Sequence, residues 1–321
     1  MGSSTATRTP NDHGGAFGAP PWRGVFAVLT TPFHAGGALD LDGLDAQAAY
    51  CVAADADGVV ANVNASEYWT LCDDERRLVA ERVVRAIDRA IPVIIGVAAG
   101  SAPWAAALAA HASDTGADAV IAMPPGHSGA MPRAAIVDYF ERIAEASQVP
   151  VFVQNYHTPA SSQMAPELVA ELVREIERVD FIKEEAFRAG QAIETEIELA
   201  GPKLRGIMGG LAGRYMIDEF SRGSCGTMPA CEVVDVHVQV WRALEAGDRR
   251  AARDLFNRLL PLLNYEALTP GVYKTVLRRR GVLHSSYMRS HAGNPLDASD
   301  ERELSHILHD MSDMFLLAPP K

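Results

Sequence analysis

The chain has 321 residues, of which 48% are hydrophobic, so it can bury one enzyme-sized core or two modest ones. Its formal net charge of -12 opposes binding to nucleic acid or to an anionic membrane surface, because both require clustered Lys and Arg. No stretch approaches the roughly 20 apolar residues that span a bilayer, and the first residues lack the apolar core of a signal peptide. We therefore expect a cytoplasmic protein that binds neither nucleic acid nor membrane.

Short apolar runs alternate with amphipathic segments along most of the chain. Residues 1–22 are rich in Gly, Pro, Ser and Thr, and we expect a disordered tail there. The runs that follow are typical of buried parallel strands. They are GVFAVLT (24–30), GVVANV (58–63), PVIIGV (92–97), AVIAM (119–123), PVFVQ (150–154), FIKEE (181–185), LRGIMGG (204–210) and a weaker GSCGTM (223–228).

Helical patterns lie between these runs. Residues 73–90 begin with an acidic first turn and place Leu78, Val79 and Val83 on one face. Eight such strand–helix units over residues 23–248 predict an α/β fold, a closed (β/α)8 TIM barrel. An open doubly wound sheet is the alternative, but no GxGxxG or GxxxxGK[ST] pattern follows the first strand. The spacing of apolar residues over 249–321 predicts a C-terminal extension of three helices packed on the barrel.

The patterns that would indicate a metal or a disulfide framework are missing. The four cysteines are widely spaced and form no CxxC pair, so we expect reduced thiols and no zinc site. His306 and His309 lie three residues apart on a predicted helix, but no third ligand accompanies them. The sequence therefore predicts neither a metal nor another cofactor.

Lys183 stands out because it interrupts an apolar strand. Barrel enzymes place their reacting groups at the C-terminal ends of strands, and Lys183 lies at such an end. Burial beside Phe181 and Ile182 is expected to lower the lysine pKa and to yield a neutral amine that attacks a carbonyl. The alternative is a structural ion pair with Glu184 or Glu185, which the spacing alone supports equally well.

Five stretches in order resemble the dihydrodipicolinate synthase / N-acetylneuraminate lyase superfamily. They are GVFAVLTTPF near the start, SEYWTLCDDER after strand two, FIKEE around Lys183, GIMGG at strand seven and GSCGTM at strand eight. The resemblance covers roughly residues 22–315. It implies a (β/α)8 barrel, a Schiff-base lysine at position 183, substrate contacts from Gly209 and Met228, and a homotetramer built as a dimer of dimers.

Departures from the family pattern bear on the substrate. The loop that usually reads GTTGE is here Val63-Asn64-Ala65-Ser66-Glu67. Backbone N–H groups of Ala65 and Ser66, with the Asn64 amide, are expected to bind the substrate carboxylate. Glu67 is expected to fix the loop rather than to contact substrate.

The strand-five tyrosine that relays protons in the family is replaced by Gln154, whose amide orients a hydroxyl or a water but is neither acid nor base. Tyr156 or His157 takes over that role if the loop turns inward; otherwise both are surface residues. The synthases' arginine after this strand is also absent, so lysine biosynthesis is not expected.

These departures resemble the 2-keto-3-deoxyarabonate dehydratase-like subgroup. The resemblance implies a carbon–oxygen lyase (hydro-lyase) that dehydrates a 2-keto-3-deoxy sugar acid through an imine at Lys183, with Gln154 and Tyr156 beside it. A class I pyruvate-dependent aldolase on the same scaffold is the alternative. A more distant alternative is a barrel that binds a 2-oxo acid without catalysis.

Overall fold

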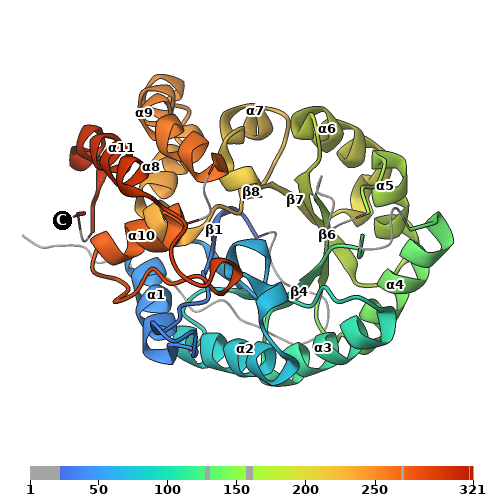
Figure 1. The fold of residues 1–321 in the computed structure, drawn as a ribbon. Coiled ribbons are helices and arrows are strands. Elements are labelled where there is room, and N and C mark those ends of the chain that lie inside the picture. The colour runs from blue at the N-terminus through green and yellow to red at the C-terminus, as the bar shows by residue number, and fades with distance from the viewer. Residues whose placement is uncertain (1–21, 127–130, 157–161, 269–270, 318, 321) are drawn as a thin grey trace, which may run out of the picture.

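The computed structural model describes residues 22–126, 131–156, 162–268, 271–317 and 319–320. Eight parallel strands close into a barrel in chain order, β1 to β8, which confirms the predicted TIM barrel (Figure 1). The strands are β1 (Gly24–Val28), β2 (Gly58–Ala61), β3 (Val93–Gly96), β4 (Ala119–Ala122), β5 (Val151–Tyr156), β6 (Val179–Glu185), β7 (Gly206–Gly209) and β8 (Gly226–Thr227).

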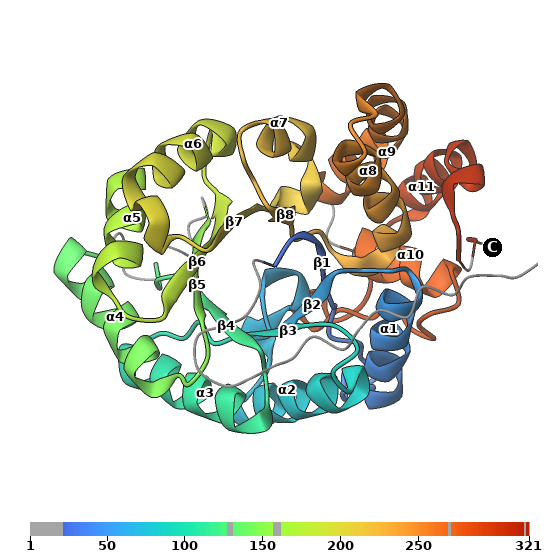
Figure 2. The same cartoon turned by 180° about the vertical axis from the view of Figure 1, so that it is seen from behind.

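Helices form a ring outside the barrel, as Figures 1 and 2 show from opposite sides. They are α1 (Leu41–Ala53), α2 (Asp73–Ile87), α3 (Ala102–Thr115), α4 (Arg133–Ala146), α5 (Pro166–Glu175), α6 (Ala189–Ala200), α7 (Met216–Ser221) and α8 (Val234–Glu245). Three further helices, α9 (Arg249–Leu268), α10 (Val272–Arg279) and α11 (Ala298–Asp310), lie beside α8 and α1. Apolar side chains of α9 and α11 share a cluster with Val236 and Val240 of α8.

The inner faces of the helices follow the predicted pattern with one exception. On α2, Val79 and Val83 are buried in the core between helices and barrel. Leu78, which the sequence pattern placed on that face, is 38% exposed. Val79, Val83 and Ile87 keep a helical spacing of four residues and suffice to cover the strands, so Leu78 lies beyond the edge of the buried stripe.

Trp22, which the sequence analysis includes in the expected tail of residues 1–22, packs inside the barrel. Its indole is buried and stacks on Phe181 at 5.1 Å and on Phe152 at 6.0 Å between ring centroids. Both partners point into the barrel interior from the starts of β6 and β5. A single aromatic residue shows no hydrophobic periodicity, and Trp22 directly follows a Gly- and Pro-rich segment. The sequence pattern therefore does not predict its contacts with Phe152 and Phe181.

No helix among the described residues is long and apolar enough to cross a bilayer.

Candidate active site

A cavity of about 320 Å³ opens at the C-terminal ends of the strands. Parallel strands in a closed barrel bring these ends together, so residues distant in sequence line one space. Its lining comes from β1, β5 and β6 and from the loops after β2, β7 and β8, with further residues from α9 and α10. The polar lining residues are Asn64, Tyr156, Lys183, Glu185, Arg214, Glu266 and Tyr273.

Lys183 lies in this cavity, with its ammonium nitrogen Nζ 3.2 Å from Glu185 Oε2. Both side chains are buried, at 4% and 6% exposure. The ion pair that the sequence left as an alternative is therefore present, but it lies inside the cavity where a ligand can reach it. Because residues 183 and 185 are two apart on β6, their side chains share one face of the strand.

Glu185 is held by two neutral donors as well as by the lysine. Gln154 Nε2 donates to Glu185 Oε2 at 2.6 Å, and the backbone N–H of Leu211 donates to Oε1 at 2.9 Å. Gly210 makes room for the carboxylate, since a Cβ at that position would lie 2.2 Å from Oε1. The next two residues, Leu211 and Ala212, have φ of 50° and 59°, a costly conformation for residues other than glycine, and both line the cavity.

The two strand-five residues have different environments. Gln154 pairs in register with Lys183, and its amide nitrogen donates to Glu185. Tyr156 pairs in register with Glu185 and lines the cavity, so its side chain does turn inward. Burial, and then the charge of Glu185, raise the pKa of the Tyr156 phenol, which therefore stays protonated at neutral pH. His157 lies outside the described residues.

The loop after β2 divides into residues that line the cavity and one that supports the loop. Asn64 and Ala65 line the cavity. Ser66 does not offer the N–H group predicted for the substrate carboxylate, because that group donates to Val63 O at 2.9 Å. Its hydroxyl is also committed and donates to Leu29 O at 2.6 Å. Ser66 therefore stabilises the turn through internal hydrogen bonds, whereas Asn64 and Ala65 line the cavity.

Glu67 fixes this loop, as the sequence analysis expected. It is buried at φ 52° and forms an ion pair with Lys274 of α10. Ser290 donates to its other oxygen from both the backbone N–H, at 3.0 Å, and the hydroxyl, at 2.7 Å. The C-terminal extension thereby holds the loop after β2 in place.

The family resemblance implies substrate contacts from Gly209 and Met228, but only Met228 is among the residues that line the cavity. Gly209 instead packs against Glu219 of α7, where a Cβ would lie 1.8 Å from Oε2. A glycine at this position is explained by that contact rather than by a substrate.

Several buried carboxyl groups surround β6, and the sequence patterns did not reveal them. Glu219 has no hydrogen-bond partner for either oxygen among the described residues, and burial raises its pKa to about 8. Glu196 is buried beside Glu184, and burial raises its pKa to about 11. Glu184 accepts from Asn155 Nδ2 at 2.9 Å. Glu219 and Glu196 therefore retain protons at neutral pH, and the carboxylate in contact with Lys183 is that of Glu185.

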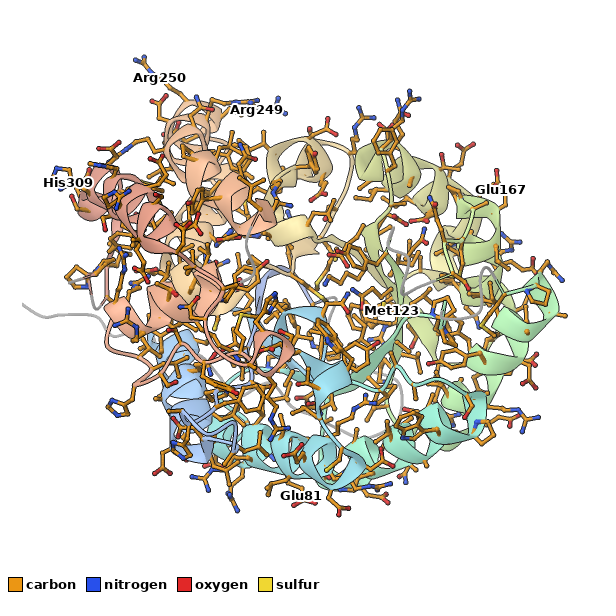
Figure 3. All side chains as sticks on the ribbon, in the orientation of Figure 1. Glu81, Met123, Glu167, Arg249, Arg250 and His309 are labelled. Atoms are coloured by element: carbon orange, nitrogen blue, oxygen red, sulfur yellow. The ribbon has the colours of Figure 1, made fainter. Side chains whose placement is uncertain are left out.

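A second cavity of about 570 Å³ adjoins the first. Asn64 and Tyr156 line both cavities, so the two are neighbours across these side chains. The walls of the second are largely aromatic and aliphatic, with Tyr68, Trp69, Leu71, Trp104 and Met123 among its residues. Figure 3 shows Met123 inside the ring of helices.

Comparison with known proteins agrees with this geometry. A model of the Dihydrodipicolinate synthetase family matches residues 21–311. The chain is 29% identical over 274 residues to L-2-keto-3-deoxyarabonate dehydratase of Azospirillum brasilense, which covers 84% of this chain and 88% of that protein. It is 27% identical over 254 residues to the probable 2-dehydro-3-deoxy-D-pentonate aldolase YjhH of Escherichia coli (strain K12), which covers 78% and 83%.

Among solved structures, that of dihydrodipicolinate synthase from Rhodopseudomonas palustris matches with a TM-score of 0.83 at 29% identity. The match covers 92% of this chain and 100% of that one. The names of these three proteins state different reactions. Because the family model spans nearly the whole barrel and its extension, this chain belongs to the Dihydrodipicolinate synthetase family.

Proposed function

We propose that this protein is a Schiff-base hydro-lyase that dehydrates a 2-keto-3-deoxy sugar acid on Lys183. The observation that carries the proposal is the buried group of Lys183, Glu185 and Gln154 at the C-terminal end of the barrel. A lysine supplies the amine for an imine, and a carboxylate 3.2 Å away can take and return its proton. A pure binding site has no chemical need for this pairing, which argues against the non-catalytic alternative.

The reaction begins when Glu185 accepts a proton from Lys183 and the free amine attacks the C2 ketone. The carbinolamine hydroxyl takes that proton from Glu185 and leaves as water, which restores the carboxylate and forms an iminium that acidifies the hydrogens on C3. Glu185 removes one of these, and the electrons of that C–H bond form the enamine. The enamine then expels the C4 hydroxyl, which takes the proton from Glu185 and leaves as water. Hydrolysis of the remaining iminium frees the dehydrated 2-oxo acid and Lys183.

Gln154 favours dehydration over aldol cleavage. Cleavage of the C3–C4 bond requires a base for the C4 hydroxyl, and glutamine cannot supply one. Its amide instead donates to Glu185 and holds this carboxylate beside the lysine. The name of the Azospirillum brasilense relative, a dehydratase of a 2-keto-3-deoxy sugar acid, supports the same reaction.

One observation favours the aldolase alternative. Tyr156 lines the catalytic cavity, so a phenol is present beside Lys183 even though the usual strand-five position is Gln154. Its raised pKa makes it a proton donor rather than a base at neutral pH. A protonated phenol can give a proton to the hydroxyl that leaves in dehydration. It cannot take a proton from the C4 hydroxyl, as aldol cleavage requires.

Borohydride trapping tests the imine. Incubation with pyruvate and borohydride should add one ligand mass to the peptide that contains Lys183, because reduction fixes the imine as an amine. Lys183→Ala should take up no label and lose turnover while the barrel stays folded. Labelling at Lys203, which lies outside the cavity, in place of Lys183 would refute the proposal.

Product analysis separates the two lyase reactions. With a 2-keto-3-deoxy pentonate or hexonate, the wild-type protein should form a dehydrated 2-oxo product and release little pyruvate. Stoichiometric pyruvate and aldehyde, lost in Tyr156→Phe, would establish the aldolase instead.

The iminium itself withdraws the electrons, so the proposed reaction requires no metal or dissociable cofactor. Activity should therefore survive dialysis against EDTA. Loss of activity that a divalent ion restores would redirect the proposal to a metal-dependent lyase.

A further inference from the structure

One wall of the catalytic cavity carries polar residues that the proposed reaction does not use. Arg214 lies between β7 and α7, Glu266 lies on α9 and Tyr273 on α10, and all three line this cavity. The loop that carries Asn64 follows β2, and two strands, β8 and β1, separate β2 from β7 in the barrel. Arg214 and the loop after β2 therefore lie on different sides of the same space.

The contacts of Arg214 leave part of its guanidinium free. Nε and Nη2 both donate to one acceptor, Leu263 O of α9, at 2.9 Å and 2.6 Å. Nη1 makes no hydrogen bond to the residues that the structure describes, yet it is not a buried atom, and Arg214 as a whole is only partly buried. The two bonds to Leu263 use the side edge of the guanidinium. The end edge, formed by Nη1 and Nη2, is open in the geometry that binds a carboxylate through two N–H groups.

The charge of this guanidinium acts on groups inside the catalytic cavity. Burial raises the pKa of three cavity side chains, and the positive charge of Arg214 lowers each of these pKa values. The three are Tyr156, Glu266 and Tyr273.

Glu266 does not neutralise Arg214. Burial, and then the neighbouring Glu232, hold the pKa of the Glu266 carboxyl well above its usual value, so this group stays protonated at neutral pH. Arg214 forms no ion pair with any other carboxylate in the described part of the chain. A partly buried cation without an anion is unfavourable, and an anionic ligand would compensate it.

We propose that Arg214 binds a carboxylate at the far end of the substrate. The substrate would then be a 2-keto-3-deoxy sugar acid with a carboxylate at each end, one beside Asn64 and Ala65 and the other beside Arg214. This inference rests on the proposed imine at Lys183, which fixes the position of the first end. It accounts for an open cationic edge at the catalytic cavity of a protein whose net charge is -12.

Two pairs of probes test the inference through imine trapping. Each pair has one chain length and differs in the distal carboxylate: 2-oxoglutarate against 2-oxopentanoate, and 2-oxoadipate against 2-oxohexanoate. Half-saturation of borohydride labelling at Lys183 is measured for all four acids. At least one diacid should half-saturate the wild-type protein at a concentration about tenfold or more below that of its monoacid, because the second carboxylate gains charge-assisted hydrogen bonds.

Variants assign this preference to one side chain. Arg214→Gln keeps a donor for Leu263 O but removes the charge, so the half-saturating concentration of the diacid should rise to that of its monoacid. A purely structural role would weaken labelling by both acids alike. Arg214→Lys should retain part of the preference.

Arg253→Gln is the matched control. Arg253 is an exposed residue of α9 that lines a groove of about 410 Å³ together with Arg214, but it does not line the catalytic cavity. This variant should keep the preference of wild type. Loss of the preference in Arg253→Gln would place the anion in the groove and overturn the inference.

Equal half-saturation by each diacid and its monoacid in the wild-type protein would also overturn the inference and leave the imine intact. This comparison decides the question even if Arg214→Gln fails to fold. Absence of labelling with all four probes would instead overturn the proposed function, and this inference with it.

Discussion

At the scale of single residues, the sequence located the lysine but not its surroundings. Lys183 was identifiable because a cation in an apolar strand requires an explanation, and its burial at the cavity agrees with that expectation. Glu185 was considered only as a structural partner, since spacing along β6 does not show that a carboxylate faces a cavity. Ser66 and Gly209 were placed at the substrate by resemblance, but the contacts of both are internal.

Glu185→Gln should separate imine formation from proton transfer. The amide keeps the shape of the side chain but cannot carry a proton, so turnover of a 2-keto-3-deoxy acid should fall by roughly 10²–10⁴-fold. Trapping of pyruvate at Lys183 should persist to the same final stoichiometry, because the lysine is intact. Both quantities are measurable on one preparation, by product formation and by peptide mass.

The matched control for this change is Glu167→Gln. Glu167 is an exposed residue of α5 and points away from the barrel in Figure 3. It should retain wild-type turnover. Wild-type turnover in Glu185→Gln would remove this carboxylate from the mechanism and leave Tyr156 as the next group to test.

At the scale of elements, strand and helix periodicity predicted the barrel well, because the strands are buried on both faces and read as apolar runs. Contacts between distant elements were not predictable. The pair between Glu67, after β2, and Lys274, on α10, joins positions 207 residues apart, and no local pattern encodes it. The contacts of Trp22 with Phe152 of β5 and Phe181 of β6 also join distant positions and have no local sequence pattern.

Breaking the Glu67–Lys274 pair should destabilise the protein and loosen the substrate loop. Lys274→Met leaves Glu67 as a buried, partly uncompensated charge, so the free energy of unfolding should fall by about 3–5 kcal/mol. Lys274 also donates to Tyr287 O at 3.0 Å, which adds to the loss. Because the loop carries Asn64 and Ala65, KM should rise as well. Urea unfolding and steady-state kinetics measure the two effects.

The double variant Glu67→Gln with Lys274→Met should cost less than the sum of the single changes, since no lone charge remains buried. Arg250→Met is the control, because Arg250 forms an exposed pair with Asp254 and points outward in Figure 3. Its effect should stay within about 0.5 kcal/mol. Strict additivity of the two single changes would show that the residues do not act as a pair.

At the scale of the whole molecule, buried hydrogen bonds and ion pairs join the C-terminal extension to the barrel. Arg280, at the end of α10, donates to Asp235 of α8 from two nitrogens, each at 2.8 Å, and to the backbone of Glu232 at 3.0 Å. The extension also supplies Glu266 and Tyr273 to the cavity wall. The homotetramer remains a proposal from the family resemblance, which light scattering tests against the chain mass of 34.5 kDa.

At this scale, the contribution of Glu219 to stability should fall as pH rises from 5 to 9. Burial raises the pKa of this carboxyl from 4.5 to about 8 in the folded protein. Between these values the folded state holds a proton that the unfolded state has released, so the free energy of unfolding falls with increasing pH. Glu196, whose pKa burial raises to about 11, adds to the same trend.

Glu219→Gln should remove one component of this trend, because an amide stays neutral in both states. Urea unfolding at pH 5.5 and pH 8.5 should show a decrease in stability that is smaller than that of wild type by roughly 3 kcal/mol, from about 1.4 kcal/mol for each pKa unit crossed. The gain should appear at the higher pH, where wild type must bury a second carboxylate near Glu185. Glu167→Gln, at the surface, should follow wild type at both values. An unchanged difference between the two pH values in Glu219→Gln would show that this carboxyl ionises in the folded protein below pH 5.5, and would contradict the pKa raised by burial.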